Sequence, residues 1–342
     1  MLEEWKMRLP PGKIPINVLK EVVFKNLGAT RKEVTIGPTA GVDSAVIEAG
    51  EKSLVISMDP ITGAVERIGW LAVNVNANDI ATFGVEPAFL FSCLMLPEGA
   101  DKAMVETIST QMNAAACKLG MAIVGGHAES TPSLTHPIVV GCAMGMTKKG
   151  DYVTPAGAKA GDTLILTKSA GIEGTAILAS DRENELKAAL TFKELTKARD
   201  FYSQISVVED ALTARRTGGV HAMHDPTEGG VAGGIHEMAD AAGLGMKVFQ
   251  EKIAVQPETA KICLYFDLDP LQLIGSGALL ISAEKGKASE IIQRLEKQRI
   301  DAAIIGEFLP DKTQRLLVRE NMKIETLPRP ASDHLWRALS GR

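Results

Sequence analysis

Helix-like and strand-like segments alternate along the chain, and this alternation limits the possible folds more than any other feature. Apolar residues recur at helical spacing from Val65 to Phe83, with Gly84 as a natural stop. A second helix is predicted from Asp101 to Leu119. Leu54–Ser57 and Ala88–Leu96 are short apolar runs typical of buried strands. The alternation favours an α/β or α+β fold over an all-helical or all-β one.

The length of the chain, 342 residues, favours two domains of roughly 150 residues each. A polar stretch from Thr147 to Gly161 contains Gly and Pro and is the best candidate linker. We therefore expect a first domain over residues 1–150 and a second over residues 151–342. Apolar spacing also predicts a helix from Asn17 to Leu27.

Charge and composition exclude several classes of protein. The chain carries 37 basic and 42 acidic side chains, a formal net charge of −5, so a basic nucleic-acid-binding surface is not expected. No apolar run approaches the ~18 residues of a membrane span, and the N-terminal residues include acids where a secretory signal needs bases. The four cysteines are scattered and none forms a C-x-x-C pair. We expect a cytoplasmic protein without a membrane or nucleic-acid partner.

Three aspartates of the first half occupy positions where carboxylates can do chemistry. Asp43 lies in a turn after a Gly-containing loop, Asp59 ends an apolar strand, and Asp79 falls late in the helix predicted from Val65 to Phe83. Convergent carboxylates hold Mg²⁺, which prefers oxygen ligands. For any single one of the three, a turn or capping role is the favoured explanation. Asp79 and its neighbour Asn78 fit that explanation least, because Asp and Asn are poor residues inside an apolar helix.

Standard nucleotide-binding signatures are absent, since the sequence contains neither a P-loop nor a Gly-rich dinucleotide-binding motif. A different Gly pair follows a short apolar strand, at Gly125 and Gly126 before His127. It predicts a tight turn whose backbone N–H groups can approach an anion. An ordinary strand-ending turn explains these glycines equally well, and His127 also fits a hydrogen-bonded turn histidine.

The most specific segment is HDPTEGGVAGGIHEMADAAGLG, from His224 to Gly245. Asp225 or Thr227 is predicted to cap a helix that begins near Glu228, whose charge complements the positive end of the helix. Glu237, two turns into that helix, is a candidate acid or base, or simply a solvated residue.

Four glycines fill the first turns of this helix, and each costs up to ~1 kcal/mol relative to Ala. Two explanations remain open from the residues alone: close helix packing, or N–H groups presented to a phosphate or substrate. These glycines are Gly229, Gly230, Gly233 and Gly234.

Taken in order, seven segments resemble the motifs of the aminoimidazole-ribonucleotide-synthetase (PurM-like) superfamily of ATP-binding enzymes. That superfamily includes selenophosphate synthetase, thiamine-monophosphate kinase and the HypE-type hydrogenase maturation factor. The resemblance spans nearly the whole chain and implies a two-domain PurM-like fold, with an N-terminal domain that pairs with a second copy into a dimeric β-barrel. It also implies an α/β C-terminal domain, with ATP and Mg²⁺ bound between the domains. The segments are GVDSAV, SMDPITG, NANDIATFGVEP, GGHAES, HDPTEGGVAGGIHEMADAAG, DPLQLIGSGALLIS and IGEF.

The resemblance also implies roles for individual residues. Asp43, Asp59 and Asp79 resemble the metal-binding aspartates, with Asn78 beside them. Several members carry a paired Asp-Asp at the first of these motifs, where this chain has Val42 before Asp43. The remaining matches form one nucleotide-side turn and one loop that faces the acceptor substrate. They are Gly125, Gly126 and His127 for the turn, and Asp225, Thr227, Gly229 and Gly230 for the loop.

The overall spacing is most similar to the HypE-type branch, but two features differ. That branch has Arg where this chain has Glu228, and it ends in a Pro-Arg-Ile-Cys tail whose cysteine carries the group converted to cyanide. Here Leu327-Pro328-Arg329 is followed by PASDHLWRALSGR, and the last cysteine is Cys263. Without a tail thiol, the cyanide chemistry cannot run in its known form. Lys13, in a short PPGK segment, is a candidate phosphate contact.

These observations lead to one main hypothesis and two alternatives. The main hypothesis is an ATP- and Mg²⁺-dependent enzyme that phosphorylates or activates an oxygen of a small acceptor, with Asp225, Glu228 and Glu237 as candidate catalytic residues. The first alternative is a nucleotide-binding maturation or assembly factor with little catalysis, which docks a partner through the helix-like segment ASDHLWRAL. The second is a metal-dependent phosphatase that uses the same carboxylates. A homodimer is expected in each case.

Overall fold

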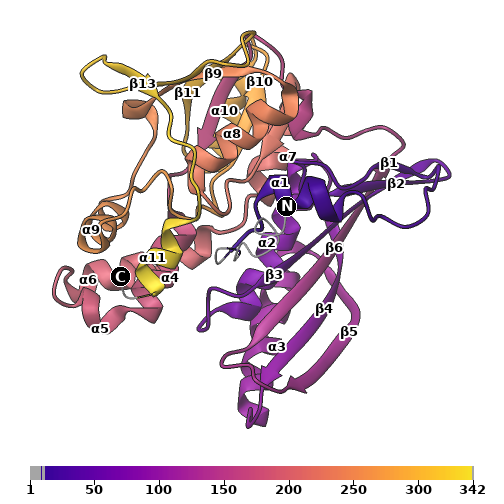
Figure 1. Cartoon of the computed structure of the whole chain (residues 1–342), viewed down its shortest axis with the longest axis vertical. Coiled ribbons are helices and arrows are strands. Elements are labelled where there is room, and N and C mark those ends of the chain that lie inside the picture. The colour runs from indigo at the N-terminus through magenta and orange to yellow at the C-terminus, as the bar shows by residue number, and fades with distance from the viewer. Residues whose placement is uncertain (1–8, 10–11, 341–342) are drawn as a thin grey trace, which may run out of the picture.

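The computed structural model describes residue 9 and residues 12–340, which form two β-sheets with helices packed against them (Figure 1). The first half of the chain builds one sheet and the second half builds the other, in a two-domain, mixed α/β PurM-like fold. The division at residue 150 remains a prediction. Among the described residues, no helix is both long and apolar enough to cross a membrane.

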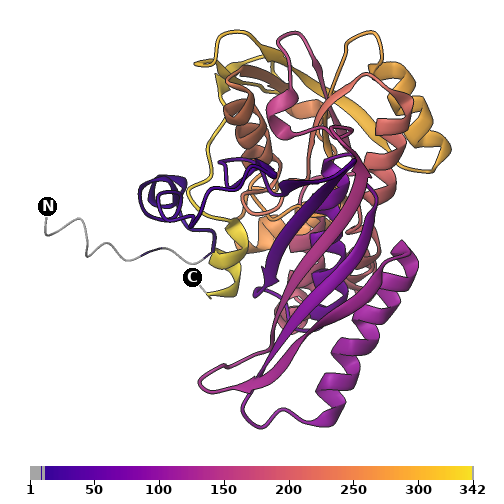
Figure 2. The same cartoon turned by 90° about the vertical axis from the view of Figure 1, so that its right-hand side faces the viewer.

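The first sheet has six strands in the order β1-β2-β3-β6-β4-β5. Its strands pair antiparallel except for β4 and β5, which run parallel. Figure 2 shows how the longer strands of this sheet extend away from the second half of the chain. The strands are β1 (Val34–Ile36), β2 (Ala45–Ala49), β3 (Lys52–Ile61), β4 (Pro87–Pro97), β5 (Ala122–Thr131) and β6 (Ile138–Lys148).

Two helices cover this sheet. α2 (Ile68–Thr82) packs on β3 and β6 on one side and against the second half of the chain on the other, so it is buried on nearly all sides. Its apolar residues therefore surround the whole helix rather than forming one stripe. α3 (Lys102–Leu119) packs against α2. The Asp101 carboxylate caps α3 by accepting a hydrogen bond from the Met104 N–H at 2.9 Å, and Gly120 ends it in the left-handed region.

The second sheet has seven strands in the order β13-β12-β9-β11-β7-β10-β8. Helices α7 and α10 pack together, and α4, α6 and α9 form a second helical group. The strands are β7 (Thr163–Thr167), β8 (Val220–His224), β9 (Gly245–Phe249), β10 (Leu280–Ala283), β11 (Ala302–Leu309), β12 (Arg315–Val318) and β13 (Ile324–Thr326). The helices are α4 (Ile172–Asp181), α5 (Glu183–Leu186), α6 (Phe192–Arg199), α7 (Val208–Thr217), α8 (Gly230–Ala242), α9 (Pro257–Phe266), α10 (Ala288–Lys297) and α11 (His334–Leu339).

Two local predictions are wrong. The helix expected from Asn17 to Leu27 is reduced to α1 (Ile16–Val18) and a five-residue π-helical turn, Leu19–Val23, with no buried residue in either. Apolar spacing alone did not produce a long helix because this segment has little protein surface to pack against. The tight turn expected at Gly125 and Gly126 is instead the middle of strand β5.

The close approach of β4 explains one of these two glycines. A Cβ at Gly126 would lie 1.9 Å from the Ser92 carbonyl oxygen of β4, and its φ of +152° also disfavours other residues. Gly126 therefore serves strand pairing, one residue beyond the shift in register between β4 and β5.

Candidate functional site

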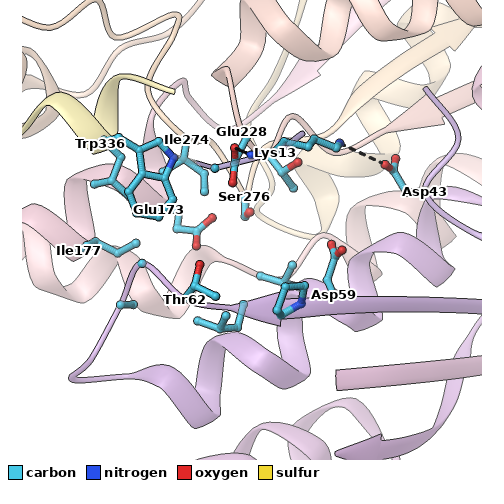
Figure 3. Close-up of a pocket in the computed structure, with 18 of the residues that line it drawn as sticks. Lys13, Asp43, Asp59, Thr62, Glu173, Ile177, Glu228, Ile274, Ser276 and Trp336 are labelled. Carbon is cyan, nitrogen blue, oxygen red and sulfur yellow. Dashed lines mark hydrogen bonds and ion pairs between the residues drawn. The ribbon is translucent and has the colours of Figure 1, made fainter. Parts of the chain in front are cut away.

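A pocket with a volume of about 500 Å³ lies between the two halves of the chain (Figure 3). The first half contributes Asp43, the end of β3 and the loop after it, and the second half contributes α4, the loop before α8, and α11. One end of the pocket is acidic and the other mainly apolar. Its polar and charged lining residues are Lys13, Asp43, Asp59, Thr62, Glu173, Thr227, Glu228 and Ser276.

The predicted aspartates converge at the acidic end. One oxygen of Asp43, one oxygen of Asp225 and one ring nitrogen of His224 all lie within 4.8 Å of one another. Asp79, on α2, accepts a hydrogen bond from the Ser57 hydroxyl at 2.6 Å. Both carboxylate oxygens of Asp225 are buried and have no hydrogen-bond partner among the described residues.

The pKa values show how strongly these carboxylates repel one another. Burial, together with the nearby Asp43 charge, raises the pKa of Asp59 to about 6 and that of Asp225 to about 7. Burial and the Asp59 charge hold the pKa of Asp79 well above its usual range. A bound cation would relieve this repulsion. The unpartnered Asp225 oxygens and an all-carboxylate donor set fit Mg²⁺.

His224 is a site residue that the sequence reasoning missed. It is fully buried, with Nδ1 2.9 Å from Asp43 Oδ2 and Nε2 2.8 Å from Glu237 Oε2. Burial alone would lower its pKa, but the charges of Asp43 and Glu237 raise that pKa to about 10, so His224 is a cation. The same ion pair holds the pKa of Asp43 below its usual range despite burial. A histidine directly before Asp225 was the only available signal.

Lys13 and Glu237 complete this charged cluster. The Lys13 ammonium lies 3.9 Å from Asp43 Oδ1 and 3.7 Å from Glu237 Oε1, and the Glu237 charge is the main reason that its pKa is raised. The Lys13 side chain is half exposed, so it can also meet a ligand. Glu237 is engaged by His224 and Lys13, which gives it a positioning role.

The loop before α8 reaches the pocket through Thr227 and Glu228. Glu228 Oε2 accepts a hydrogen bond from the Lys13 backbone N–H at 2.7 Å. The helix itself begins at Gly230, later than predicted, and neither Asp225 nor Thr227 caps it. The Asp333 carboxylate accepts from the Gly229 N–H at 2.6 Å instead.

Packing explains the glycines at the start of α8. Gly229 and Gly230 have φ of +83° and +59°, and a Cβ at Gly230 would lie 2.5 Å from the Leu273 carbonyl oxygen. Since the Gly229 N–H already has a partner in Asp333, the structure favours close packing over an anion contact here.

Two other predicted groups lie away from the pocket. The Asn78 amide donates to the Ile205 carbonyl at 2.9 Å and its oxygen accepts from the Val207 N–H at 2.8 Å, so it joins α2 to the second half of the chain. The glycines on β5 and the exposed His127, which is 3.2 Å from Glu129, are not among the residues that line the pocket. Three further residues line the pocket: Glu173, which no sequence signal indicated, Ser276 from the segment DPLQLIGSGALLIS, and Trp336 from the segment ASDHLWRAL.

Comparison with known proteins places this arrangement in a family. Family models described as AIR synthase related protein match residues 41–147 (N-terminal domain) and 159–319 (C-terminal domain). The chain belongs to the AIR synthase related protein family. This confirms the superfamily that the sequence motifs resembled.

Within the AIR synthase related family, similar proteins include hydrogenase maturation factors. The chain is 29% identical over 306 residues to a putative hydrogenase expression/formation protein of Methanocaldococcus jannaschii, covering 86% of this chain and 88% of that protein. It is 30% identical over 251 residues to the carbamoyl dehydratase HypE of Rhizobium leguminosarum bv. viciae, covering 72% and 69%. A solved structure of HypE in complex with ATP shares the fold, with a TM-score of 0.70 at 20% identity and coverage of 96% and 98%.

Proposed function

We propose that this AIR synthase related protein is an enzyme that uses ATP and Mg²⁺ to phosphorylate, or otherwise activate, an oxygen of a small acceptor. One observation carries the proposal: buried carboxylates from both halves of the chain converge, without enough positive charge, at the end of a ligand-sized pocket. The similarity to HypE proteins supports it, and ATP is the ligand in a HypE structure of the same fold.

The residues of the acidic end have separable roles in this proposal. Asp43, Asp59, Asp79 and Asp225 would hold Mg²⁺, which neutralises phosphate charge when bound. Lys13, whose ammonium borders the pocket, would approach a phosphate oxygen.

The transfer step needs a base on the acceptor side. A bond forms between the acceptor oxygen and the γ-phosphorus, the bond from that phosphorus to the bridging oxygen breaks, and ADP leaves. The acceptor proton passes to a carboxylate, for which Glu228, which lines the pocket, is the candidate. Glu237 and His224 position Asp43 through their ion pairs.

Calorimetric titration with ATP, in Mg²⁺ and separately in EDTA, tests the binding step. We expect binding in Mg²⁺, and about tenfold or greater weakening in Asp59→Asn and Asp79→Asn, because each change removes a charge from the proposed metal site. Asp151→Asn is the matched control, since Asp151 is exposed and pairs only with Arg215 among the described residues. Absence of ATP binding, or equal affinity in all three variants and the wild type, would refute the proposal.

ADP formation separates the main proposal from its alternatives. ADP formation that depends on an added acceptor supports phosphoryl transfer, whereas release of phosphate from varied esters without ATP supports a phosphatase. The docking role suggested for the C-terminal segment has less support, because Leu335 and Ala338 of α11 are buried against their own chain.

We also propose that the chain forms a homodimer through its first sheet. β5 is an edge strand with nine exposed residues out of ten, and unpaired sheet edges readily bind another strand or sheet. Light scattering of the purified chain tests this, and a monomeric mass at micromolar concentration contradicts it. A maturation partner, as the names of its relatives suggest, is a further part of the proposal.

A further inference from the structure

Glu173, Ser276 and Trp336 line the end of the pocket away from Asp43 (Figure 3). Glu173 Oε2 and Ser276 Oγ are buried and lie beside each other without the geometry of a full hydrogen bond, and Trp336 Nε1 is buried with no partner among the described residues. Glu173 is only 4% exposed and Ser276 is fully buried. Unsatisfied buried polar atoms are costly, so three of them lining one pocket indicate a ligand that satisfies them.

The backbone fixes Glu173 at this place. It lies in the first turn of α4, which follows Gly171 in the left-handed region. Gly174 packs so closely on Leu273 that a Cβ there would lie 2.4 Å from the Leu273 side chain. Burial raises the pKa of Glu173 to about 7, and the Ser276 hydroxyl beside it works in the opposite direction. The carboxyl group is therefore held in the pocket by packing, without a charge partner of its own.

The C-terminal segment forms the facing wall. Asp333 accepts hydrogen bonds from the Gly229 N–H at 2.6 Å and from the Leu335 N–H at 2.7 Å. His334 Nδ1 accepts from the Asp269 N–H at 2.9 Å. These bonds anchor both sides of the segment and place Leu335 and Trp336 on the pocket. The segment is thus a fixed wall and does not have to carry a substrate group itself.

Charge and shape limit what this end can bind. Lys13 is the one basic residue among the described residues that line the pocket, and it lies at the acidic end beside Asp43. A carboxylate or phosphate near Glu173 would therefore meet uncompensated negative charge. The apolar walls, formed by Ile177, Ile274 and Leu335 with the Trp336 ring, suit a compact hydrocarbon body.

We infer that Glu173, Ser276 and Trp336 form the acceptor subsite, and that it takes a free small molecule with an N–H-bearing nitrogen and no negative charge. The Glu173 carboxylate accepts from the nitrogen. The Trp336 N–H and the Ser276 hydroxyl bond the remaining polar atoms of the ligand, or the Trp336 ring faces its positive charge. An amine and an amide both have this chemistry. The inference rests on the proposed function only in naming the bound molecule as the acceptor.

Three probes with the same hydrocarbon body test the subsite: isoamylamine, isovaleramide and isovalerate. Each is titrated calorimetrically into the wild-type chain with ATP and Mg²⁺ present. We expect the amine or the amide to bind at least about tenfold more tightly than the carboxylate. If the amine is the preferred ligand, its affinity should be about tenfold or more weaker for Glu173→Gln than for the wild type. If the amide is preferred, its affinity should be unchanged in Glu173→Gln and about tenfold weaker in Trp336→Phe.

Trp70→Phe is the matched control, because the Trp70 indole N–H donates to the Tyr202 carbonyl at 2.8 Å, outside the pocket. This variant should bind the probes as the wild type does. The inference is overturned if isovalerate binds as tightly as the amine and the amide, or if no probe binds. It is also overturned if Trp70→Phe and Trp336→Phe lose the same affinity for the preferred probe. ATP binding is measured in the same samples: if ATP and Mg²⁺ bind but the probes do not, only this inference fails. If the probes bind but ATP does not, only the proposed function fails.

Discussion

Asp225→Asn should make the metal-free protein more stable while it damages the proposed site. Asp225 is fully buried, its two oxygens have no hydrogen-bond partner among the described residues, and the charge of Asp43 is close by. Asn has nearly the same shape but no charge. The substitution therefore removes a buried, repelled carboxylate at little cost in packing.

The size of the effect follows from the pKa of Asp225, which burial and the Asp43 charge raise from 3.8 to about 7. Each pKa unit corresponds to about 1.4 kcal/mol, so the ionised carboxylate destabilises the folded state by about 4 kcal/mol above pH 7. An unsatisfied buried Asn amide costs about 1–3 kcal/mol of this gain. We expect a net gain of about 1–3 kcal/mol, or several degrees in Tm.

The pH dependence has a definite sign. Because the pKa of Asp225 is raised in the folded state, its ionised carboxylate lowers the free energy of unfolding by the full amount above about pH 7. This destabilisation disappears as the pH falls toward 3.8, the pKa of an ordinary Asp in the unfolded chain. The advantage of Asp225→Asn should thus be largest near pH 8 and small near pH 4. Mg²⁺ binding by the wild type would also reduce it.

Urea unfolding in EDTA at about pH 8 and pH 5 measures the difference between variant and wild type. Asp162→Asn is the matched control, since Asp162 is equally buried but accepts hydrogen bonds from the Ser282 hydroxyl at 2.6 Å and the Lys159 N–H at 2.9 Å. That variant should lose about 1–3 kcal/mol. A variant Asp225→Asn that is less stable than the wild type at pH 8, or equally stabilised at both pH values, would show the reasoning to be wrong.

Two further substitutions test the packing of the site and sheet. Gly126→Ala should destabilise the chain by about 1–3 kcal/mol, because the new Cβ would lie 1.9 Å from the Ser92 carbonyl oxygen; a wild-type urea midpoint would contradict the close approach of β4 and β5. Asp333→Ala should cost about 1–3 kcal/mol by leaving the N–H groups of Gly229 and Leu335 without an acceptor. Unchanged hydrogen exchange at these two amides would contradict it.

The sequence correctly predicted elements whose first and last residues are determined by neighbouring residues in the chain. α3 begins after Asp101 and ends before Gly120 because the cap and the left-handed glycine are adjacent to the helix they limit. The strand predicted over Ala88–Leu96 is observed as β4 (Pro87–Pro97), since a strand within a sheet shows as a continuous apolar run. These features depend on neighbours within a few residues.

Predictions failed where a distant contact decides the outcome. Asp333, which lies 104 residues away, satisfies the N–H of Gly229, so no residue near the start of α8 needed to cap it. Asn78 was correctly singled out as unusual in an apolar helix, but its partners at Ile205 and Val207 are more than 120 residues away. Glu173 lay in no motif, and Trp336 was singled out only within a segment expected to dock a partner. Their role depends on which elements face one pocket, and sequence spacing does not encode that.

The acidic site also couples the two halves of the chain. Asp43, Asp59 and Asp79 come from the first half, whereas Asp225 follows β8 in the second. Among the described residues, His224 is the buried cation that joins the two sets, through its ion pair with Asp43. The halves therefore hold like charges against each other, and a cation bound by all four aspartates would stabilise their contact. Because the proposed acceptor subsite is built by α4 and α11 facing the end of β3, metal binding at one end should fix the geometry of the other.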